Sequence, residues 1–241
     1  MIKSFFFLLL LLSFSANAQI LDEYPKNQSF YNGGLAGLYK EANQILTDKK
    51  QKNCGPDEIY QPRILVTKDS VVKLITDQDS VNINKNKCAY DVSMLLLKNL
   101  HHWKPAEVNG QKFGAITEFI VYPADLMSNY QEDYDVDNFL SDANYPGGNS
   151  AFKKDFDQNF KSLFVDYQIN GIFNLEFYVS KEGKIENVRI FPLLDNKNFN
   201  SDFVRALARI KKKWKPSQYK NIPIKQRISF PIDFSVNFRE R

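Results

Sequence analysis

The chain has 241 residues, of which 43% are hydrophobic and 14% aromatic, more than a disordered chain of this length would carry. Its 32 basic and 28 acidic residues leave a formal net charge of +4, a balance that does not favour a nucleic-acid partner. The length suits one large domain or two of ordinary size.

The first 18 residues have the features of a secretory signal peptide. Lys3 is followed by an apolar run from Phe5 to Leu12, which is too short for a membrane-spanning helix of about 20 residues. The chain then becomes small and polar and reaches Ala16-Asn17-Ala18, a typical cleavage pattern. We therefore expect residues 1–18 to be removed during export, and the mature chain to have no stable membrane insertion. The alternative is an uncleaved N-terminal anchor.

Three pairs of similar segments occur in the same order along the chain. They are Tyr31-Asn32-Gly33-Gly34 with Tyr145-Pro146-Gly147-Gly148, Val66 to Ser70 with Val179 to Gly183, and Trp103-Lys104-Pro105 with Trp214-Lys215-Pro216. Chance could produce one such match, but an ordered set with nearly equal spacing indicates two tandem copies. From the two Trp residues onward the copies align without a gap, so that Phe119 matches Phe230.

In chain order, the first copy predicts a helix, two strands joined by a turn, a second helix and a last strand. The apolar positions of its helices are Leu38, Ala42 and Leu46, then Val92, Leu95, Leu96 and Trp103. Its strands are expected at Tyr60 to Thr67, Val71 to Thr76 and Phe113 to Tyr122. The helical spacing and the alternation of apolar residues are the signals for these elements.

The second copy repeats this order with a stronger pattern. Its first helix carries Phe152, Phe156, Phe160 and Leu163 at helical spacing, and its second helix is expected from Ser201 to Trp214. Strands with one buried face are predicted at Phe173 to Val179, Ile185 to Ile190 and Arg227 to Phe234. The middle strand slips by one residue in its alternation, which indicates a bulge.

The predicted fold class is α+β, with two tandem small domains. Each domain would be an antiparallel three-stranded sheet with two helices packed on it, in the order α-β-β-α-β. We place the domains at residues 30–124 and 145–238. The polar, acidic segment 125–144 between them is predicted to be a linker.

Cys54 and Cys88 are the two cysteines of the chain. In an exported protein, an even number of cysteines favours a disulfide. Cys54 precedes the first strand and Cys88 begins the second helix. Since the hairpin between them runs out and back, both lie near the same end of the domain. We therefore predict a disulfide between them; two buried free thiols are the alternative.

Two basic clusters resemble functional sites but have simpler interpretations. His101 and His102 are adjacent, so that on a helix they point about 100° apart and cannot easily share a metal ion. The run Lys211 to Lys213 precedes Trp214, which could suggest nucleic-acid binding. Since Trp214 continues an apolar stripe, we expect these lysines to lie in solvent at a helix end.

One acidic cluster resembles the start of a calcium loop. Its members are Asp133, Asp135 and Asp137. The places where that loop needs Gly and Glu hold Asn138 and Asn144, so a solvated linker is expected instead. No catalytic, metal-binding or cofactor-binding residues are predicted. We expect a protein that is not an enzyme and needs no cofactor.

Taken together, these marks resemble the TonB C-terminal domain family, in the form common in Bacteroidetes. The marks are Tyr-Pro-Gly-Gly before a helix, Lys-Glu-Gly-Lys between two strands, Trp-Lys-Pro at a helix end, and Ile-Ser-Phe-Pro-Ile-Asp-Phe in the last strand. The resemblance covers Tyr145 to Phe234. It is weaker over Tyr31 to Tyr122, where Asn32 replaces the proline.

The resemblance implies a periplasmic protein-interaction module associated with TonB-dependent outer-membrane transport. Its partner would be an envelope protein, such as an outer-membrane transporter. Energy transduction in the family also needs an N-terminal anchor and a Pro-rich spacer, whereas the prolines here are dispersed. Two alternatives stay open: an energy transducer TonB proper with an uncleaved anchor, and an envelope ligand-binding protein that reuses the fold.

The last strand of each copy is the candidate for partner binding. A strand at a sheet edge has unpaired backbone groups that can take an added strand, and the family is known for this kind of contact. The candidate residues are Arg227, Ile228, Ser229 and Phe230, since Pro231 has no N–H and blocks pairing beyond them. The matching edge in copy one, Phe113 to Tyr122, has no proline at this place. It is expected to be open unless the second copy covers it.

Overall fold

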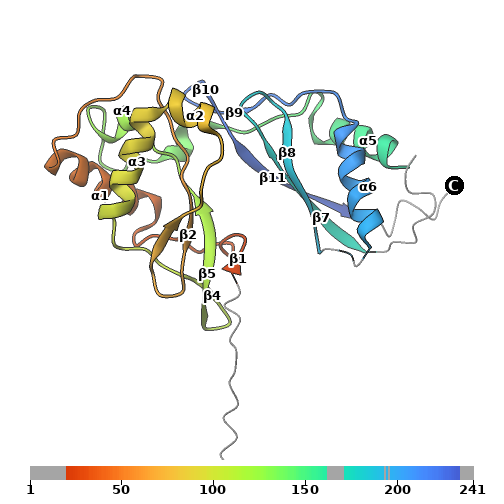
Figure 1. Ribbon diagram of the computed structural model, residues 1–241, viewed down its shortest axis with the longest axis horizontal. Helices are drawn as coiled ribbons and strands as arrows, with labels where there is room; N and C mark the ends of the chain where they lie inside the picture. Colours follow the sequence, from red (N-terminus) through yellow and green to blue (C-terminus); the bar gives the residue numbers. More distant parts are fainter. Residues whose placement is uncertain (1–19, 162–170, 193, 195, 234–241) are drawn as a thin grey trace, which may run out of the picture. The chain divides into compact units, whose positions relative to one another are not determined.

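The computed structural model describes residues 20–161, 171–192, 194 and 196–233. The predicted signal peptide, Leu163 and Phe234 lie outside these residues. The fold is mixed α+β, with sheets that are mainly antiparallel. The chain divides into two compact units, Met1–Asp135 and Val136–Arg241, which we call unit 1 and unit 2 (Figure 1).

Unit 1 contains both strands and helices. Its strands are β1 (Ile20–Leu21), β2 (Arg63–Val66), β3 (Val72–Leu74), β4 (Ala106–Val108) and β5 (Gln111–Glu118). Its helices are α1 (Gly34–Asp48), α2 (Ser80–Lys85), α3 (Lys87–Asn99) and α4 (Pro123–Leu126). The predicted apolar positions Leu38, Ala42 and Leu46 are buried on α1.

The sheet of unit 1 has the order β1-β5-β2-β3, and β4 also pairs with β5. The strands β2, β3 and β5 form the three antiparallel strands that the sequence predicts. Two further strands were not predicted: β4, which forms a hairpin with β5, and β1, which pairs with β5 in parallel. The three-stranded prediction for this copy is therefore incomplete.

The predicted disulfide is present in unit 1. Cys54 and Cys88 are bonded, with their Cα atoms 5.5 Å apart. Next to it, the Glu58 carboxylate accepts hydrogen bonds from the backbone N–H of Cys88 at 2.7 Å and of Ala89 at 3.3 Å. These N–H groups lie in the first turn of α3, where they have no partner within the helix. The disulfide and Glu58 thus fasten the chain before β2 to the start of α3.

Unit 2 holds the clearer match to the predicted elements. Its helices are the 3-10 helix η1 (Val136–Phe139), α5 (Gly148–Lys161) and α6 (Lys197–Ala208). Its strands are β6 (Leu140–Ser141), β7 (Ile172–Val179), β8 (Ile185–Phe191), β9 (Ser217–Tyr219), β10 (Ile222–Ile224) and β11 (Gln226–Asp233). The predicted bulge is confirmed, since the register between β7 and β8 shifts between Glu176 and Tyr178.

The main sheet of unit 2 has the order β11-β7-β8, and all its pairs are antiparallel. Helices α5 and α6 lie side by side on one face of it (Figure 1). The core between them is rich in aromatic rings: Phe152 packs on Phe177 and Trp214, with ring centroids 5.6 and 5.1 Å apart. Burial of the inward face of each element explains the apolar spacing in the sequence.

A hairpin in each unit follows the matched Trp. In unit 1, β4 and β5 pair as Ala106↔Phe113 and Val108↔Gln111. In unit 2, β9 and β10 pair as Ser217↔Ile224 and Tyr219↔Ile222, at the same offset that separates Trp103 from Trp214. Both turns have two consecutive residues with positive φ, as a two-residue hairpin requires: Asn109 and Gly110, then Lys220 and Asn221. The β5–β2 and β11–β7 registers correspond in the same way.

The matched Tyr and Trp of each copy come into contact. The Tyr31 and Trp103 rings meet edge to face at 5.0 Å, and the Tyr145 and Trp214 rings meet at 5.3 Å. Backbone hydrogen bonds fix each approach: the Lys104 N–H donates to the Phe30 carbonyl at 2.9 Å, and the Lys215 N–H donates to the Asn144 carbonyl at 2.8 Å. The first and last matched segments of each copy are therefore in contact.

The second helix of each copy ends earlier than the sequence predicts. Helix α6 begins at Lys197, where the Asn196 side chain caps it, and ends at Ala208 rather than at Trp214. Trp214 is buried all the same, at 4% exposure, and its N–H donates to the Gly183 carbonyl. The apolar spacing therefore indicated the buried face correctly but extended the helix too far.

The predicted acidic linker is largely structured. Its first part belongs to unit 1, where α4 ends at Leu126 and the Tyr134 ring packs on Tyr39 at 5.1 Å. Its second part belongs to unit 2, where β6 pairs with β9 to form the second sheet, in the order β10-β9-β6. An acidic and polar composition hid these elements because their few buried side chains show no period.

Candidate functional site

Strand β11 lies at an edge of the main sheet of unit 2. It pairs with β7 through its whole length, from Gln226↔Val179 to Asp233↔Ile172. Among the described residues, no strand pairs with its other side. The four candidate residues, Arg227 to Phe230, are consecutive in this strand, so the structure places them together at one edge.

The side chains of β11 alternate between the core and the open face of the sheet. Ile228 lies opposite Phe177 and Phe230 opposite Leu175, and the Phe230 ring meets Phe152 edge to face at 5.4 Å. These two side chains are partly buried and pack against the hydrophobic core of unit 2. Ser229 is exposed on the open face. A partner strand would therefore meet the backbone of β11, with Ser229 as the accessible side chain.

Arg227 is held by a charge cluster on the open face. Its guanidinium lies 2.8 Å from the Glu176 carboxylate on β7, and Arg189 on β8 donates to the same carboxylate from the other side. Glu176 is only 8% exposed, although it is charged. Burial of a carboxylate is tolerated here because two guanidinium groups neutralise it. The cluster links side chains from all three strands of the sheet.

Pro231 indicates which backbone groups of β11 face outward. Proline fits an edge strand where its missing N–H would point away from the neighbouring strand. Backbone direction alternates along a strand, so residues two apart share a side. Arg227 and Ser229 therefore present their N–H and C=O groups to the open edge. At the start of the strand, the Gln226 side chain bonds Ala143 and Asp142, which limits pairing there to Arg227 onward.

The matching edge in unit 1, predicted to be open unless the second copy covers it, is covered in part. Strand β1 pairs with it at Ile20↔Gly114 and Leu21↔Ala115, and β4 pairs with residues 111–113. The positions that match Arg227 to Phe230 are 116–119, and among the described residues no strand pairs with them on the side opposite β2. The covering strands come from the same unit. Sheet edges are commonly protected in this way against unwanted pairing.

Each unit also contains a tyrosine–carboxylate pair that the sequence analysis missed. The Tyr145 hydroxyl donates to Asp155 at 2.6 Å, and Lys212 donates to the same oxygen at 2.7 Å. In unit 1 the Tyr31 hydroxyl donates to Glu41 at 2.7 Å. The sequence could have indicated these pairs, because an acidic residue follows the matched tyrosine at the same spacing in both copies: Glu41 after Tyr31 and Asp155 after Tyr145.

These pairs shift the pKa of their members. The pKa of Asp155 is lowered by the hydrogen bond from Lys212 and then by that from Tyr145. Burial raises the pKa of Glu41, but hydrogen bonds from His102 and Tyr31 outweigh it, so the net pKa is lowered. The pKa of Tyr145 is raised, first by burial and then by Asp155. In unit 2 the Tyr145 hydroxyl, the Asp155 carboxylate and the Lys212 ammonium thus form one structural contact between helix α5 and the segment before Trp214. In unit 1 Tyr31 and His102 contact Glu41.

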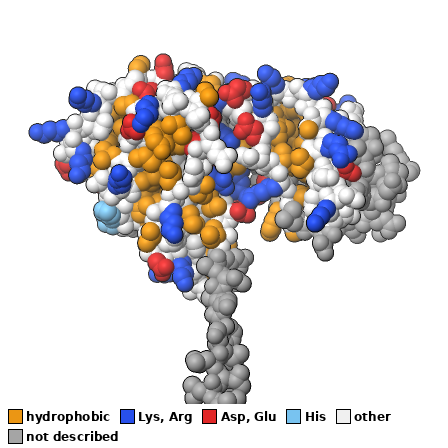
Figure 2. Space-filling view, viewed as in Figure 1, with side chains coloured by type: hydrophobic (Ala, Val, Ile, Leu, Met, Phe, Trp, Pro, Cys, Tyr) orange, Lys and Arg blue, Asp and Glu red, His pale blue; other side chains and the backbone are white. Residues whose placement is uncertain are grey.

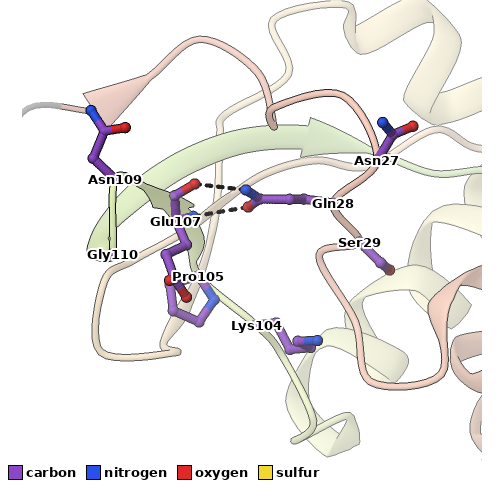
Figure 3. Close-up of a pocket in the computed structure, with 8 residues that line it drawn as sticks. All are labelled: Asn27, Gln28, Ser29, Lys104, Pro105, Glu107, Asn109 and Gly110. Atoms are coloured by element: carbon purple, nitrogen blue, oxygen red, sulfur yellow. Dashed lines mark hydrogen bonds between the residues drawn. The ribbon is translucent and has the colours of Figure 1, made fainter.

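One cavity of about 350 Å³ opens on unit 1 between residues 27–29 and 104–110. Figure 3 shows Gln28 reaching across it to Glu107. The Gln28 amide donates to the Glu107 carbonyl at 2.6 Å and accepts from the Glu107 N–H at 2.9 Å. Most of the lining is polar: Asn27, Gln28, Ser29, Lys104, Glu107 and Asn109, with Pro105 and Gly110.

The comparisons with known proteins come out negative. No family model, no curated protein and no solved structure matches this chain. Within the part of the chain that the structure describes, no group of three or more His, Cys, Asp or Glu residues could hold a metal ion. In the same residues, no helix is long and apolar enough to cross a membrane.

Proposed function

We propose that this protein is an exported, periplasmic interaction module without enzymatic activity, built from two tandem domains that resemble the TonB C-terminal domain. In this proposal unit 2 binds an extended segment of an envelope protein, such as an outer-membrane transporter, by strand addition to Arg227–Phe230. Unit 1 is the degenerate copy. The main-chain edge supplies affinity, and the flanking side chains supply register.

The observation that carries the proposal is the open edge of β11. Pro231 fits an edge strand where its missing N–H would point away from β7, so the backbone groups of Ser229, two residues before it, are expected to face the same way. A strand edge of this kind is a template for an added strand. The matched registers of β5–β2 and β11–β7 support descent from one domain. In Figure 2, basic and acidic side chains are interspersed over the face in view, which gives no support to a nucleic-acid partner.

The short segment between the apolar run and strand β1 favours an exported module over an energy transducer. Strand β1 begins at Ile20, and residues 13–19 separate it in sequence from the apolar run that would serve as an anchor. Such a segment spans at most about 25 Å, which is short for a spacer that must reach a distant membrane. Mass spectrometry of the mature N-terminus tests this directly: a start at Gln19 supports the module, and an intact Met1 supports the transducer.

The partner-binding edge is tested with Ser229→Pro in the mature chain. The substitution removes one outward N–H and leaves the pairing with β7 in place. The control is Ser229→Ala, which changes the side chain and keeps the N–H. A partner is first captured from envelope extracts by pull-down and then titrated against each variant. We expect the proline variant to lose at least about tenfold in affinity and the alanine variant to bind normally.

Other outcomes of this experiment have distinct meanings. Unchanged affinity in a folded Ser229→Pro variant would remove β11 as the binding edge. Equal loss in both variants would assign binding to the serine side chain instead of the backbone. The ligand-binding alternative has the polar cavity of Figure 3 in its favour. It would be supported if envelope saccharides or small molecules, and no protein, were retained by the mature chain.

A further inference from the structure

The edge of β5 in unit 1 is occupied by the beginning of the described chain. Ile20 and Leu21 run parallel to β5 and pair with Gly114 and Ala115. Parallel pairing between segments so far apart in sequence is not the result of a hairpin. It has the geometry of a peptide that adds to the exposed edge of a sheet.

The pairing itself is small. Strand β1 has two residues, and Ile20 keeps half of its surface exposed, at 50%. A ladder of this length contributes little stability by itself, because isolated pairs of short strands are marginal in water. Attachment to the rest of the chain, which keeps the segment at a high local concentration, must supply most of what holds it in place.

The segment that follows β1 is fastened at separate points. The Tyr24 hydroxyl donates to the Lys104 carbonyl at 2.7 Å, and the Gln28 amide forms its two bonds with the Glu107 backbone. The open polar cavity lies beside the Gln28–Glu107 attachment, between residues 27–29 and 104–110 (Figure 3). An attachment of this kind can open locally without unfolding the sheet.

Unit 2 shows how the same region is built without such a segment. There, β6 pairs with β9 through its backbone, at Leu140↔Tyr219 and Ser141↔Gln218. In unit 1 the corresponding hairpin strand is β4, and no backbone strand pairs with it on the side opposite β5 in the described residues. Instead, the Gln28 side-chain amide forms both hydrogen bonds that a neighbouring strand would form: it donates to the Glu107 carbonyl and accepts from the Glu107 N–H. In unit 1 the chain before the first α-helix is thus attached to its hairpin by a side chain, whereas in unit 2 it is attached by backbone pairing. Strand β1 is an added strand that unit 1 has in addition.

We propose that the β5 edge at Gly114 and Ala115 is a strand-binding site, with residues 20–24 of the same chain as its resident ligand. While they are bound, Gly114 and Ala115 cannot accept a partner strand. When they are released, the site accepts another extended segment in parallel, of the kind that β1 represents: an apolar pair followed by acidic residues and a tyrosine. This inference concerns unit 1 alone and does not depend on partner binding by β11.

The test uses the mature chain without residues 19–23 and, as the probe, a synthetic peptide with the sequence of residues 19–26. NMR spectra of the ¹⁵N-labelled protein are followed during titration. We expect the amide signals of Gly114 and Ala115 to shift in the shortened chain and not in the intact mature chain, whose site is occupied. A control peptide with Leu21→Pro should bind at least about tenfold more weakly, because it lacks one backbone N–H.

Two results would overturn the proposal. One is a folded shortened chain whose Gly114 and Ala115 signals stay unmoved up to millimolar peptide. The other is equal binding of the peptide to the shortened and the intact chain. A failure of Ser229→Pro to affect partner binding would leave these signals unchanged, so the two proposals are tested separately.

A second measurement covers the case in which the shortened chain does not fold. Hydrogen exchange of the intact mature chain compares the amides that pair β1 with β5 and those that pair β2 with β5. If β1 is a resident ligand, its amides exchange at least about tenfold faster, by local release. Equal protection of both sets would show that β1 opens only when the whole sheet unfolds, and would overturn the proposal.

Discussion

The backbone of Trp214 lies against Gly183, the glycine of the turn between β7 and β8. The Trp214 N–H donates to the Gly183 carbonyl at 3.0 Å, and a Cβ added to Gly183 would stand 2.0 Å from the Trp214 carbonyl oxygen. Gly183 also has a φ of +75°, which L side chains rarely adopt. Gly183 is therefore required for two reasons: its backbone has a positive φ, and the Trp214 backbone leaves no room for a Cβ.

Gly183→Ala should destabilise unit 2 strongly. The methyl group would collide with backbone that cannot move without breaking the Trp214–Gly183 contact, in addition to the cost of the positive φ. We expect a loss of at least about 2 kcal/mol in the free energy of unfolding, measured by urea titration. Gly148→Ala is the matched control, since its φ is +76° with nothing within 4 Å of the added Cβ. A control loss as large as that of Gly183→Ala would contradict the steric argument.

The two buried tryptophans should respond differently to replacement by phenylalanine. The Trp103 indole N–H donates to the Leu100 carbonyl at 2.8 Å, whereas the Trp214 indole N–H is buried without a hydrogen-bond partner among the described residues. Trp103→Phe leaves a carbonyl unpaired, and Trp214→Phe removes an unpaired donor. We expect Trp103→Phe to cost about 1 kcal/mol more, by chemical denaturation. Equal costs would show that lost ring volume dominates both substitutions.

The Asp155 cluster should make unit 2 sensitive to acid. Because the folded-state pKa of Asp155 is lowered, mainly by Lys212 and then by Tyr145, its contribution to stability is present above the unfolded-state pKa of about 4. It is lost as the pH falls through the lower folded-state pKa. Asp155→Asn should therefore lose stability at pH 7 and show a smaller further loss between pH 4 and pH 2.

The pH comparison has its own control. Tyr145→Phe removes the weaker of the two hydrogen-bond effects on Asp155 and retains Lys212. It should keep more of the acid dependence than Asp155→Asn. Urea midpoints across the acid range provide the measurement. An Asp155→Asn variant with the wild-type acid profile would place the acid sensitivity elsewhere.

The disulfide should stabilise unit 1 and leave unit 2 unaffected. Cys54 and Cys88 close a loop with a sequence separation of 34. A crosslink of this span restricts the unfolded chain and contributes roughly 3–4 kcal/mol in the chain-entropy model. The double variant Cys54→Ser and Cys88→Ser should lower the urea midpoint of unit 1 signals in NMR spectra. Equal movement of unit 2 signals would show that the two units unfold as one.

Local patterns in the sequence determined most of the elements and the disulfide. The alternation from Phe173 to Val179 and from Arg227 onward predicted β7 and β11 because one face of each strand is buried whatever its neighbours are. The slip in alternation at Ile185 to Ile190 predicted the bulge in β8. Cys54 and Cys88 could be paired because a predicted hairpin of known direction lies between them.

Tertiary structure decided what periodicity cannot express, namely which backbone groups find partners. The apolar spacing continues through Trp214, yet α6 ends at Ala208, and the Trp214 N–H bonds the Gly183 carbonyl in the turn between β7 and β8. Nothing in Ile20 and Leu21 marks them as a strand, since two residues have no period. They become β1 only because the edge of β5 offers unpaired backbone groups. By itself, then, the sequence determined which side chains are buried in these elements, and the folded chain decided which positions of each sheet edge are paired.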